Sequence, residues 1–238
     1  KENRKINILQ SLNKSKSEIL NIIPNNFTFF RRMSFNKNVI DNNYNNFMNN
    51  QNVQEKKLDS IFFGVKEIGE VSINGESILI FDYENFDIED YLKSFNKLTK
   101  YRGQKIYGGS NLNLSEFDVL DFKISKSFDY ATNINSFLIL SNDLNVLQNL
   151  ILNYNNRSLI SKDENFIKFL EFIPNKTTYF EIINNADNED NKGFPYWFSN
   201  YELKGNSNFK SLYTTPSFDL KKNKNLNLKF SKKLKNEI

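Results

Sequence analysis

The 238-residue sequence contains no cysteine and no histidine. The lack of cysteine excludes disulfides, thiolate metal sites and cysteine nucleophiles. The lack of histidine excludes catalytic triads with an imidazole base, imidazole zinc sites and histidine-ligated haem. Catalysis would have to depend on Asp, Glu, Lys, Tyr, Ser or Thr. We therefore expect a protein that is not an enzyme and that has no catalytic residues, cofactor or metal.

Glycine and proline are scarce, with 8 and 4 residues, and long apolar runs are missing. No run approaches the ~20 residues that a membrane-spanning helix needs. The sequence begins without Met and without a signal-peptide pattern, so any membrane anchor is expected outside residues 1–238. Phenylalanine is abundant, with 23 residues, while charged residues make up 25%. This balance is typical of a folded protein with a sizeable core.

Positive charge is weak overall, at +4, and gathers only near the end of the chain. A nucleic-acid-binding surface would normally spread over several elements. Leu226, Leu228 and Phe230 alternate with polar residues there, which predicts an edge strand rather than a phosphate-binding tail. We expect no nucleic-acid partner. The lysines of this cluster are Lys221, Lys222, Lys224, Lys229, Lys232, Lys233 and Lys235.

A short phrase occurs twice in the sequence. IIPNNFTFF at 22–30 and FIPNKTTYF at 172–180 share the frame apolar-Ile-Pro-Asn-x-x-Thr-aromatic-Phe and lie 150 residues apart. Each reads as a helix that ends before proline, an Asn turn and an outgoing strand. Two interpretations of the repetition stay open: a duplicated unit, or a common junction that occurs twice by chance.

Between the two copies, the pattern alternates between strands and helices. Asn74-Gly75 separates two apolar runs and predicts a β-hairpin. Residues 36–52, of which 9 of 17 are Asn, predict a polar surface loop. Asp87 is expected to cap a helix of about three turns that reaches Leu98.

Two further helices are expected in the second half of the chain. One begins after Ser141 or Asn142 and presents Leu147 and Leu150 on one face, and the other begins at Ser161 with capping-box spacing. The fold class that follows is α+β, a mainly antiparallel sheet with helices on one face, with duplication as an option. The expected division is a linker or frayed helix at 1–15, an α+β unit at 16–160, the start of a second unit or a continuation of the same sheet at 161–220, and a Lys-rich strand or linker at 221–238.

Acidic residues are densest between Asp82 and Asp90. Their spacing matches neither a calcium loop nor a fixed catalytic pair, and Asp87 already has a use as a helix cap. The carboxylates are therefore interpreted as structural.

GFPYWFSNY at 193–201 is the most aromatic segment and includes the sole Trp. Buried, it would be part of an antiparallel sheet; exposed, it would be a contact surface for protein or glycan, because Trp and Tyr often anchor interfaces. The candidate interaction residues are Phe194, Tyr196, Trp197, Phe198 and Tyr201.

Four short motifs resemble a family of bacterial extracytoplasmic proteins of unknown function, most closely its versions in Bacteroidota, many of which are lipoproteins. They are the segments at 23–25, 101–107, 137–141 and 172–175. The resemblance implies a lipid-anchored protein of the cell envelope, periplasmic or associated with the outer membrane, and a β-propeller-like region after residue 238. It supplies no catalytic residues. It also raises Ser60, within Asp59-Ser60-Ile61, as a candidate O-glycosylation site, although an ordinary strand start explains the same residues.

We therefore expect a scaffold or accessory subunit of an outer-membrane assembly or secretion complex, held by protein partners and by a lipid anchor outside this chain. The alternative is a glycan- or ligand-binding module, or a carboxylate-based enzyme, of the envelope. Exposure of Trp197 beside a carboxylate would favour this alternative, whereas an extended contact surface would favour the scaffold.

Overall fold

The computed structural model describes residues 11–49, 60–113, 117–119, 122–124, 127–171, 173–184, 196–204, 207–214 and 230–234. The strands are β1 (Phe29–Ser34), β2 (Val65–Ile73), β3 (Glu76–Tyr83), β4 (Asn96–Tyr101), β5 (Gln104–Asn113), β6 (Phe117–Val119), β7 (Phe122–Ile124), β8 (Ser127–Ile134), β9 (Phe137–Ser141), β10 (Tyr179–Asn184), β11 (Tyr196–Lys204), β12 (Ser207–Thr214) and β13 (Phe230–Leu234). The helices are η1 (Ile19–Asn21), α2 (Lys37–Asn49), η2 (Ser60–Phe62), α3 (Ile88–Leu92), α4 (Leu144–Asn156), η3 (Ile160–Lys162) and α5 (Glu164–Leu170).

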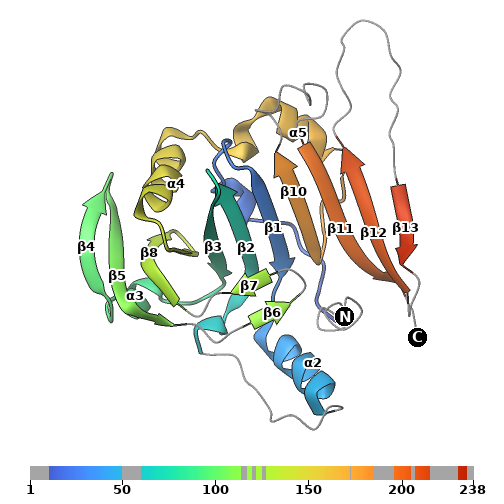
Figure 1. Cartoon of the computed structure of the whole chain (residues 1–238), viewed down its shortest axis with the longest axis horizontal. Coiled ribbons are helices and arrows are strands. Elements are labelled where there is room, and N and C mark those ends of the chain that lie inside the picture. The colour runs from blue at the N-terminus through green and yellow to red at the C-terminus, as the bar shows by residue number, and fades with distance from the viewer. Residues whose placement is uncertain are drawn as a thin grey trace, which may run out of the picture.

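Eleven strands form one sheet in the order β13-β12-β11-β10-β1-β2-β3-β9-β8-β5-β4 (Figure 1). Each neighbouring pair in this sheet is antiparallel, and β6 pairs separately with β7. The predicted α+β class with an antiparallel sheet is therefore confirmed. The strands of residues 161–220, β10 to β12, continue the sheet that the earlier strands form.

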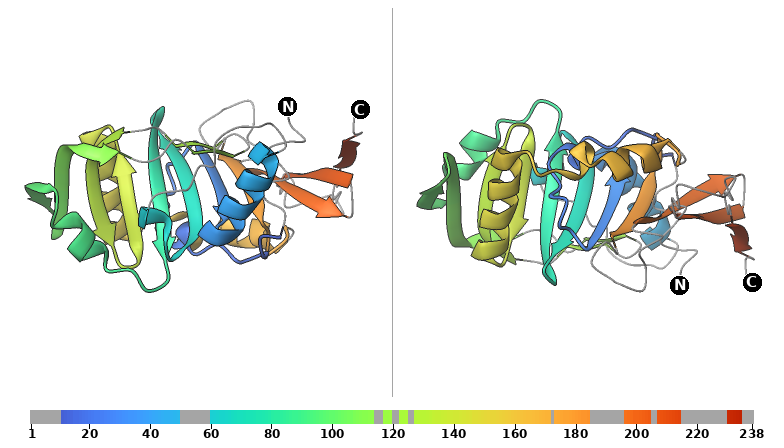
Figure 2. Two further views of the ribbon diagram at one scale, coloured as in Figure 1. Left: turned by 90° about the horizontal axis from the view of Figure 1, so that it is seen from below. Right: turned by 90° about the horizontal axis from the view of Figure 1, so that it is seen from above.

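Helices cover both faces of the sheet rather than the single face that we expected. In Figure 2, α4 and α5 lie in front of the sheet seen from above, and α2 lies in front of it seen from below. Side chains alternate between the faces along each strand, so one strand can supply two cores. Ile78 and Ile80 of β3 join the core under η1, α4 and α5, whereas Phe81 joins the core under α2 and α3.

Most of the Asn-rich segment forms a helix, α2, rather than the expected surface loop; residues 50–52 lie outside the described parts of the chain. The side chain of Asn36 accepts a hydrogen bond from the backbone N–H of Val39 at 3.1 Å, so it caps α2. Ile40 is fully buried in the core, and Tyr44 and Phe47 follow it at helical spacing. Asparagine is a poor helix former, but its weak preference is overridden by the cap and the packing of Ile40.

Three other sequence predictions need correction. The helix after Asp87 covers only Ile88–Leu92, and Leu98 lies in strand β4. The cap of α4 is Asp143, whose carboxylate accepts from Asn145 N at 2.7 Å and Val146 N at 3.0 Å. The cap of α5 is Asp163, not Ser161. Asp is as good an N-cap as Ser or Asn, so neighbouring candidates cannot be separated by residue type alone.

The Asn74-Gly75 hairpin is confirmed. Ile73 of β2 pairs directly with Glu76 of β3, which leaves a two-residue turn. Asn74 has φ 53° and Gly75 has φ 86°, the left-handed values that a tight hairpin turn requires and that Asn and Gly adopt most readily.

Candidate functional site

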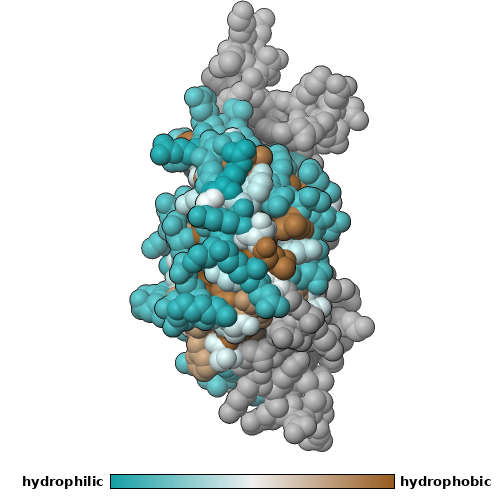
Figure 3. Space-filling view, turned by 90° about the vertical axis from the view of Figure 1, so that its left-hand side faces the viewer, coloured by the Kyte–Doolittle hydropathy of each residue, from teal (hydrophilic) through white to brown (hydrophobic). Residues whose placement is uncertain are grey.

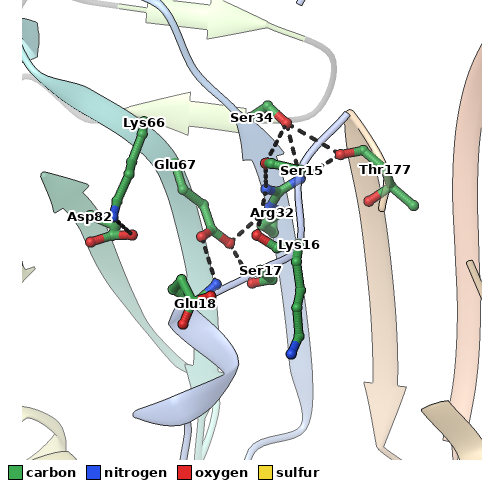
Figure 4. A network of polar contacts seen from close by, with 10 residues as sticks. All are labelled: Ser15, Lys16, Ser17, Glu18, Arg32, Ser34, Lys66, Glu67, Asp82 and Thr177. Atoms are coloured by element: carbon green, nitrogen blue, oxygen red, sulfur yellow. Dashed lines mark hydrogen bonds and ion pairs between the residues drawn. The ribbon is translucent and has the colours of Figure 1, made fainter. Parts of the chain in front are cut away.

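Three charged side chains lie side by side in the interior, on one face of the sheet. Arg32 of β1, Glu67 of β2 and Asp82 of β3 are 0%, 2% and 1% exposed. They come from three neighbouring strands, at the end of the sheet crossed by residues 11–18 (Figure 4). Fully buried charges are rare in proteins unless they are paired, so each of them needs an explanation.

Arg32 and Glu67 form a buried ion pair whose hydrogen-bonding capacity is well used. Arg32 Nε donates to Glu67 Oε1 at 2.8 Å, and Arg32 Nη1 donates to the Thr177 carbonyl at 2.7 Å. Glu67 also accepts from the Ser17 hydroxyl at Oε1 and from the Glu18 backbone N–H at Oε2, the latter at 2.9 Å. The pair therefore ties β1 and β2 to the N-terminal segment and to the entry of β10 (Figure 4).

Asp82 lies directly opposite Glu67 in the β2–β3 register, so two carboxylates face each other across the strands. Such like-charge pairs are destabilising unless something offsets them. The hydroxyl of Ser136 donates to Asp82 Oδ1 at 2.8 Å, and the ammonium of Lys66 lies 3.2 Å from Oδ2. The direction of the Lys66 contact is not that of a hydrogen bond, and Oδ2 accepts none from any residue in the described parts of the chain.

Burial raises the pKa of Asp82 above its ordinary value of 3.8, and the negative charge of Glu67 adds to the increase. The hydroxyl of Ser136 and the ammonium of Lys66, by its charge and by its close contact with the carboxylate, lower this pKa and oppose the effect of burial. Asp82 therefore differs from Glu67. Three hydrogen-bond donors lie at the oxygens of Glu67, whereas the one contact that the described residues give Asp82 Oδ2 is the ion pair with Lys66.

Two cavities meet at this carboxylate. One, of about 240 Å³, lies between the N-terminal segment and the start of α2, and the other, of about 440 Å³, extends toward Ser136 and Tyr154 of α4. Both are lined by Glu18, Lys66 and Asp82. We refer to the two cavities together as the Asp82 hollow.

Two residues of the aromatic segment 193–201 are buried, so they cannot belong to an exposed contact patch. Tyr196 and Phe198 are 4% and 1% exposed. The ring of Tyr196 stacks on Phe169 with centroids 5.9 Å apart, and its hydroxyl donates to Asp163 at 3.1 Å. Phe198 stacks on Phe180 at 5.1 Å. The contact interpretation is therefore wrong for these two residues, because the core already covers them.

The other candidate residues have different outcomes. Trp197 and Tyr201 belong to β11, opposite Ile183 and Tyr179 of β10, but their side chains lie outside the described parts of the structure, as does Phe194. Ser60 is exposed at the start of η2, as a modification site requires, and whether it carries a glycan stays a prediction.

The acidic stretch from Asp82 to Asp90 is divided among separate roles. Asp82 is buried in the hollow, whereas Asp87 caps α3 by accepting from Asp90 N at 2.9 Å. Asp90 pairs with Lys93, and Glu89 lies 3.7 Å from Lys105. The structural interpretation therefore fits Asp87, Glu89 and Asp90. No group of three potential metal ligands occurs among the residues that the structure describes.

A second candidate surface is the sheet edge formed by β4. This strand ends the strand order and pairs with β5 alone. All its residues from Asn96 to Lys100 are exposed. The side chain of Leu98 is 54% exposed and lies over Gly108 of β5, where any Cβ would collide with it.

Comparisons with known proteins give one distant structural neighbour. No family model and no curated protein matches the sequence. The crystal structure of TP0453 in crystal form I aligns with 87% of this chain and 81% of its own, with a TM-score of 0.41 and 10% identity. This likeness is too distant to indicate a family or a function. Among the described residues, no helix is long and apolar enough to cross a bilayer.

Proposed function

We propose that this chain is a non-enzymatic protein of the cell envelope that binds protein partners, as a scaffold or accessory subunit of an outer-membrane assembly or secretion complex. In this proposal it is periplasmic or outer-membrane-associated and held at the membrane by a lipid anchor outside residues 1–238. The observation that carries the proposal of partner binding is the open, exposed edge strand β4.

An edge strand supports this role because its outer side presents backbone N–H and C=O groups that no strand of its own sheet satisfies. An extended segment of a partner can add to such an edge through main-chain hydrogen bonds, with side chains providing selectivity. Strand β4 has six residues, enough for several hydrogen bonds of this kind. The side of the molecule that carries β4 is largely hydrophilic with smaller apolar areas, which suits a polar contact rather than a buried core (Figure 3).

The charge of this edge indicates the partner's chemistry. Lys97 and Lys100 lie on β4, and Arg102 follows it in the turn to β5 with its guanidinium 5.9 Å from the centre of the Tyr101 ring. Lysines on an edge discourage pairing with a second copy of the same strand, because like charges would meet. An acidic strand or loop would be attracted instead.

The test uses the full-length protein in its native membranes. Because residues 1–238 contain no cysteine, Thr99→Cys supplies a single site for a short thiol-reactive crosslinker on β4. Glu76→Cys, at the exposed start of β3, is the matched control. We expect Thr99→Cys to give a defined product with one outer-membrane subunit, Glu76→Cys to give none, and Lys97→Glu with Lys100→Glu to reduce the product about tenfold.

Three results would contradict the proposal. The first is the same pattern of products from Thr99→Cys and Glu76→Cys, which would mean random collision. The second is a protein that is recovered alone, gives no product at β4 and has an amino terminus that mass spectrometry shows to be unlipidated. A product that contains a second copy of this chain would also contradict the accessory role, because it would make β4 a self-association edge.

A further inference from the structure

The Asp82 hollow has features of a built site that the proposed role of the β4 edge does not use. Its central carboxylate is 1% exposed, lines both cavities and keeps one oxygen without a hydrogen bond from the described residues. A buried carboxylate oxygen left in this state is costly, because it has lost water and gained no full replacement. A donor that entered either cavity could supply the missing hydrogen bond.

We propose that the Asp82 hollow binds a small organic cation through a primary ammonium group that hydrogen-bonds Asp82 Oδ2. Lys66 marks the position: its own ammonium lies 3.2 Å from that oxygen, in range for an ion pair but poorly directed. The Lys66 side chain is 46% exposed, so its ammonium can turn into solvent with only a partial loss of packing. A ligand ammonium then takes its place with better geometry.

The charges of the lining favour a cation over an anion. In the larger cavity the ionisable carboxylates are Glu18 and Asp82, against the single cation Lys66. Once the ligand displaces Lys66, the carboxylates of Glu18 and Asp82 both attract the ligand's ammonium group. Glu18 is held in place by Asn21, whose amide donates to Oε2 at 3.0 Å, so it forms a second, positioned acceptor. Charge-assisted hydrogen bonds of this kind are roughly twice as strong as neutral ones.

The rest of the larger cavity suits an extended polar molecule. Asn135 and Tyr154 line it and are linked by a hydrogen bond of 3.0 Å, so their remaining donor and acceptor capacity faces a fixed position. Ser136 is already used, because its hydroxyl donates to Asp82 Oδ1. These groups favour a ligand with a second polar end, such as a short diamine, over a purely apolar amine.

Glu67 is excluded as the anchor although it faces Asp82. Its oxygens already accept from Arg32, Ser17 and the backbone of Glu18, so it has little capacity left for a ligand. Its role is to hold negative charge next to Asp82, which strengthens the attraction for a cation at Oδ2.

The experiment is isothermal titration calorimetry of the purified chain with 1,4-diaminobutane at neutral pH and low ionic strength. The neutral isostere 1,4-butanediol is the ligand control, and Glu76→Gln, which removes an exposed carboxylate elsewhere, is the protein control. We expect binding of the diamine, none of the diol, and an unchanged affinity in Glu76→Gln. Asp82→Asn is expected to weaken binding at least tenfold.

Lys66→Gln gives the sharper test, because the proposal predicts a gain. Removing the resident ammonium should tighten diamine binding several-fold. The Lys66 side chain is half-exposed, and circular dichroism of the variant checks that it folds. Should Asp82→Asn fail to fold, the result with Lys66→Gln alone decides. If neither the wild type nor Lys66→Gln binds the diamine, the proposal is overturned.

The same pair of variants separates other ligand classes. The zwitterion 4-aminobutanoate tests whether Lys66 binds a ligand carboxylate. If it does, the affinity for 4-aminobutanoate would fall in Lys66→Gln. If the wild type bound 4-aminobutanoate more tightly than the diamine, the assignment to a plain cation would be overturned. Equal diamine affinity in wild type and Asp82→Asn would overturn it as well, because contact would then lie elsewhere on the chain. None of these outcomes depends on the β4 edge, so this inference and the proposed function fail independently.

Discussion

Arg31 of β1 and Glu181 of β10 pair directly across neighbouring strands of the sheet, and residue 31 plus the sequence offset of 150 is residue 181. The offset that relates the two copies of the repeated phrase therefore maps each residue of this pair onto the other. The two flanking pairs are exchanged by the offset: Phe30 corresponds to Phe180 and Arg32 to Ile182, so the pair Phe30–Ile182 maps onto the pair Phe180–Arg32. An antiparallel pair with this register has a local two-fold axis perpendicular to the sheet.

The strands beyond this pair follow the same symmetry. β2 and β3 lie outside β1, and β11 and β12 lie outside β10, each joined by antiparallel pairing. The helical segments before the two strands, η1 and α5, contribute to the same core. This arrangement is what a duplicated unit would give, and the duplication itself stays a prediction.

The aromatic rings of Phe30 and Phe180, which the offset also relates, should be energetically coupled. Their centroids are 5.5 Å apart in an edge-to-face arrangement, and both side chains are buried. Each change to Ala is expected to destabilise the fold by about 3–5 kcal/mol. In a double-mutant cycle measured by urea unfolding, the coupling should be about 0.5–1.5 kcal/mol. Phe30 with Leu92, which lies in the other core, is the control pair and should show additive effects.

Glu67→Gln should destabilise the protein far more than Glu70→Gln. Glu67 is paired with Arg32 at side-chain exposures of 3% and 0%, and the loss of its charge leaves a buried guanidinium uncompensated. Breaking such a pair costs about 3–5 kcal/mol. Glu70 pairs with Arg31 at exposures of 18% and 13%, so this pair keeps some contact with water and the cost should be smaller than for Glu67. Equal losses in urea midpoint would contradict the special role of the Arg32–Glu67 pair.

Much of the fold follows from local patterns, but the buried charges do not. The Asn74-Gly75 turn and the alternation of apolar residues in β2 and β3 predict the hairpin, because turn chemistry and side-chain period act over a few residues. Arg32, Glu67 and Asp82 come from segments up to 50 residues apart, counting from 32 to 82, and only the strand order brings them together. A usable signal existed: Arg32 occupies the inward position two residues after Phe30, where an apolar residue would be expected.

The helix assignments failed where one pattern fitted two structures. Leu98 continues the helical spacing of Ile88 and Leu92, yet it lies on β4 because the strand partner β5 supplies long-range pairing that a window of a few residues does not contain. Conversely, the many Asn residues of 36–52 concealed the spacing of Ile40, Tyr44 and Phe47 in α2. The composition of this segment favours a loop, but the burial of Ile40 in the core stabilises a helix.

The stability difference between Asp82→Asn and the wild type should depend on pH. The folded-state pKa of Asp82 is raised, so the folded protein binds this proton more tightly than the unfolded chain does. As pH rises from about 3.8 through the folded-state pKa, the wild type therefore loses stability that Asp82→Asn keeps. Urea unfolding of both proteins from pH 3.5 to 8 should show the difference moving in favour of the variant with increasing pH.

Glu76→Gln, at the exposed start of β3, is the control for the loss of one negative charge. Its change in unfolding free energy at each pH is subtracted from that of Asp82→Asn. A difference that moves in favour of the wild type with increasing pH would mean that Lys66 and Ser136 stabilise the carboxylate more than burial penalises it. In that case the Asp82 oxygen would not be short of a partner.

Gly108→Ala should loosen β4 through Leu98, and Leu98→Ala should suppress the effect. A Cβ at Gly108 would collide with Leu98 Cδ1 and lie 2.8 Å from its Cγ, whereas the Asp129 carbonyl oxygen would be 3.3 Å away. Since Leu98 is 54% exposed, it can turn outward, so the expected cost is about 1–2 kcal/mol, within the range for overpacking. In a Leu98→Ala background the same glycine change should be nearly neutral. Urea unfolding measures both, and hydrogen exchange of the β4 amides should rise in Gly108→Ala alone. If the cost persists without Leu98, the strain comes from the Asp129 backbone, and β4 packs against β5 without help from this side chain.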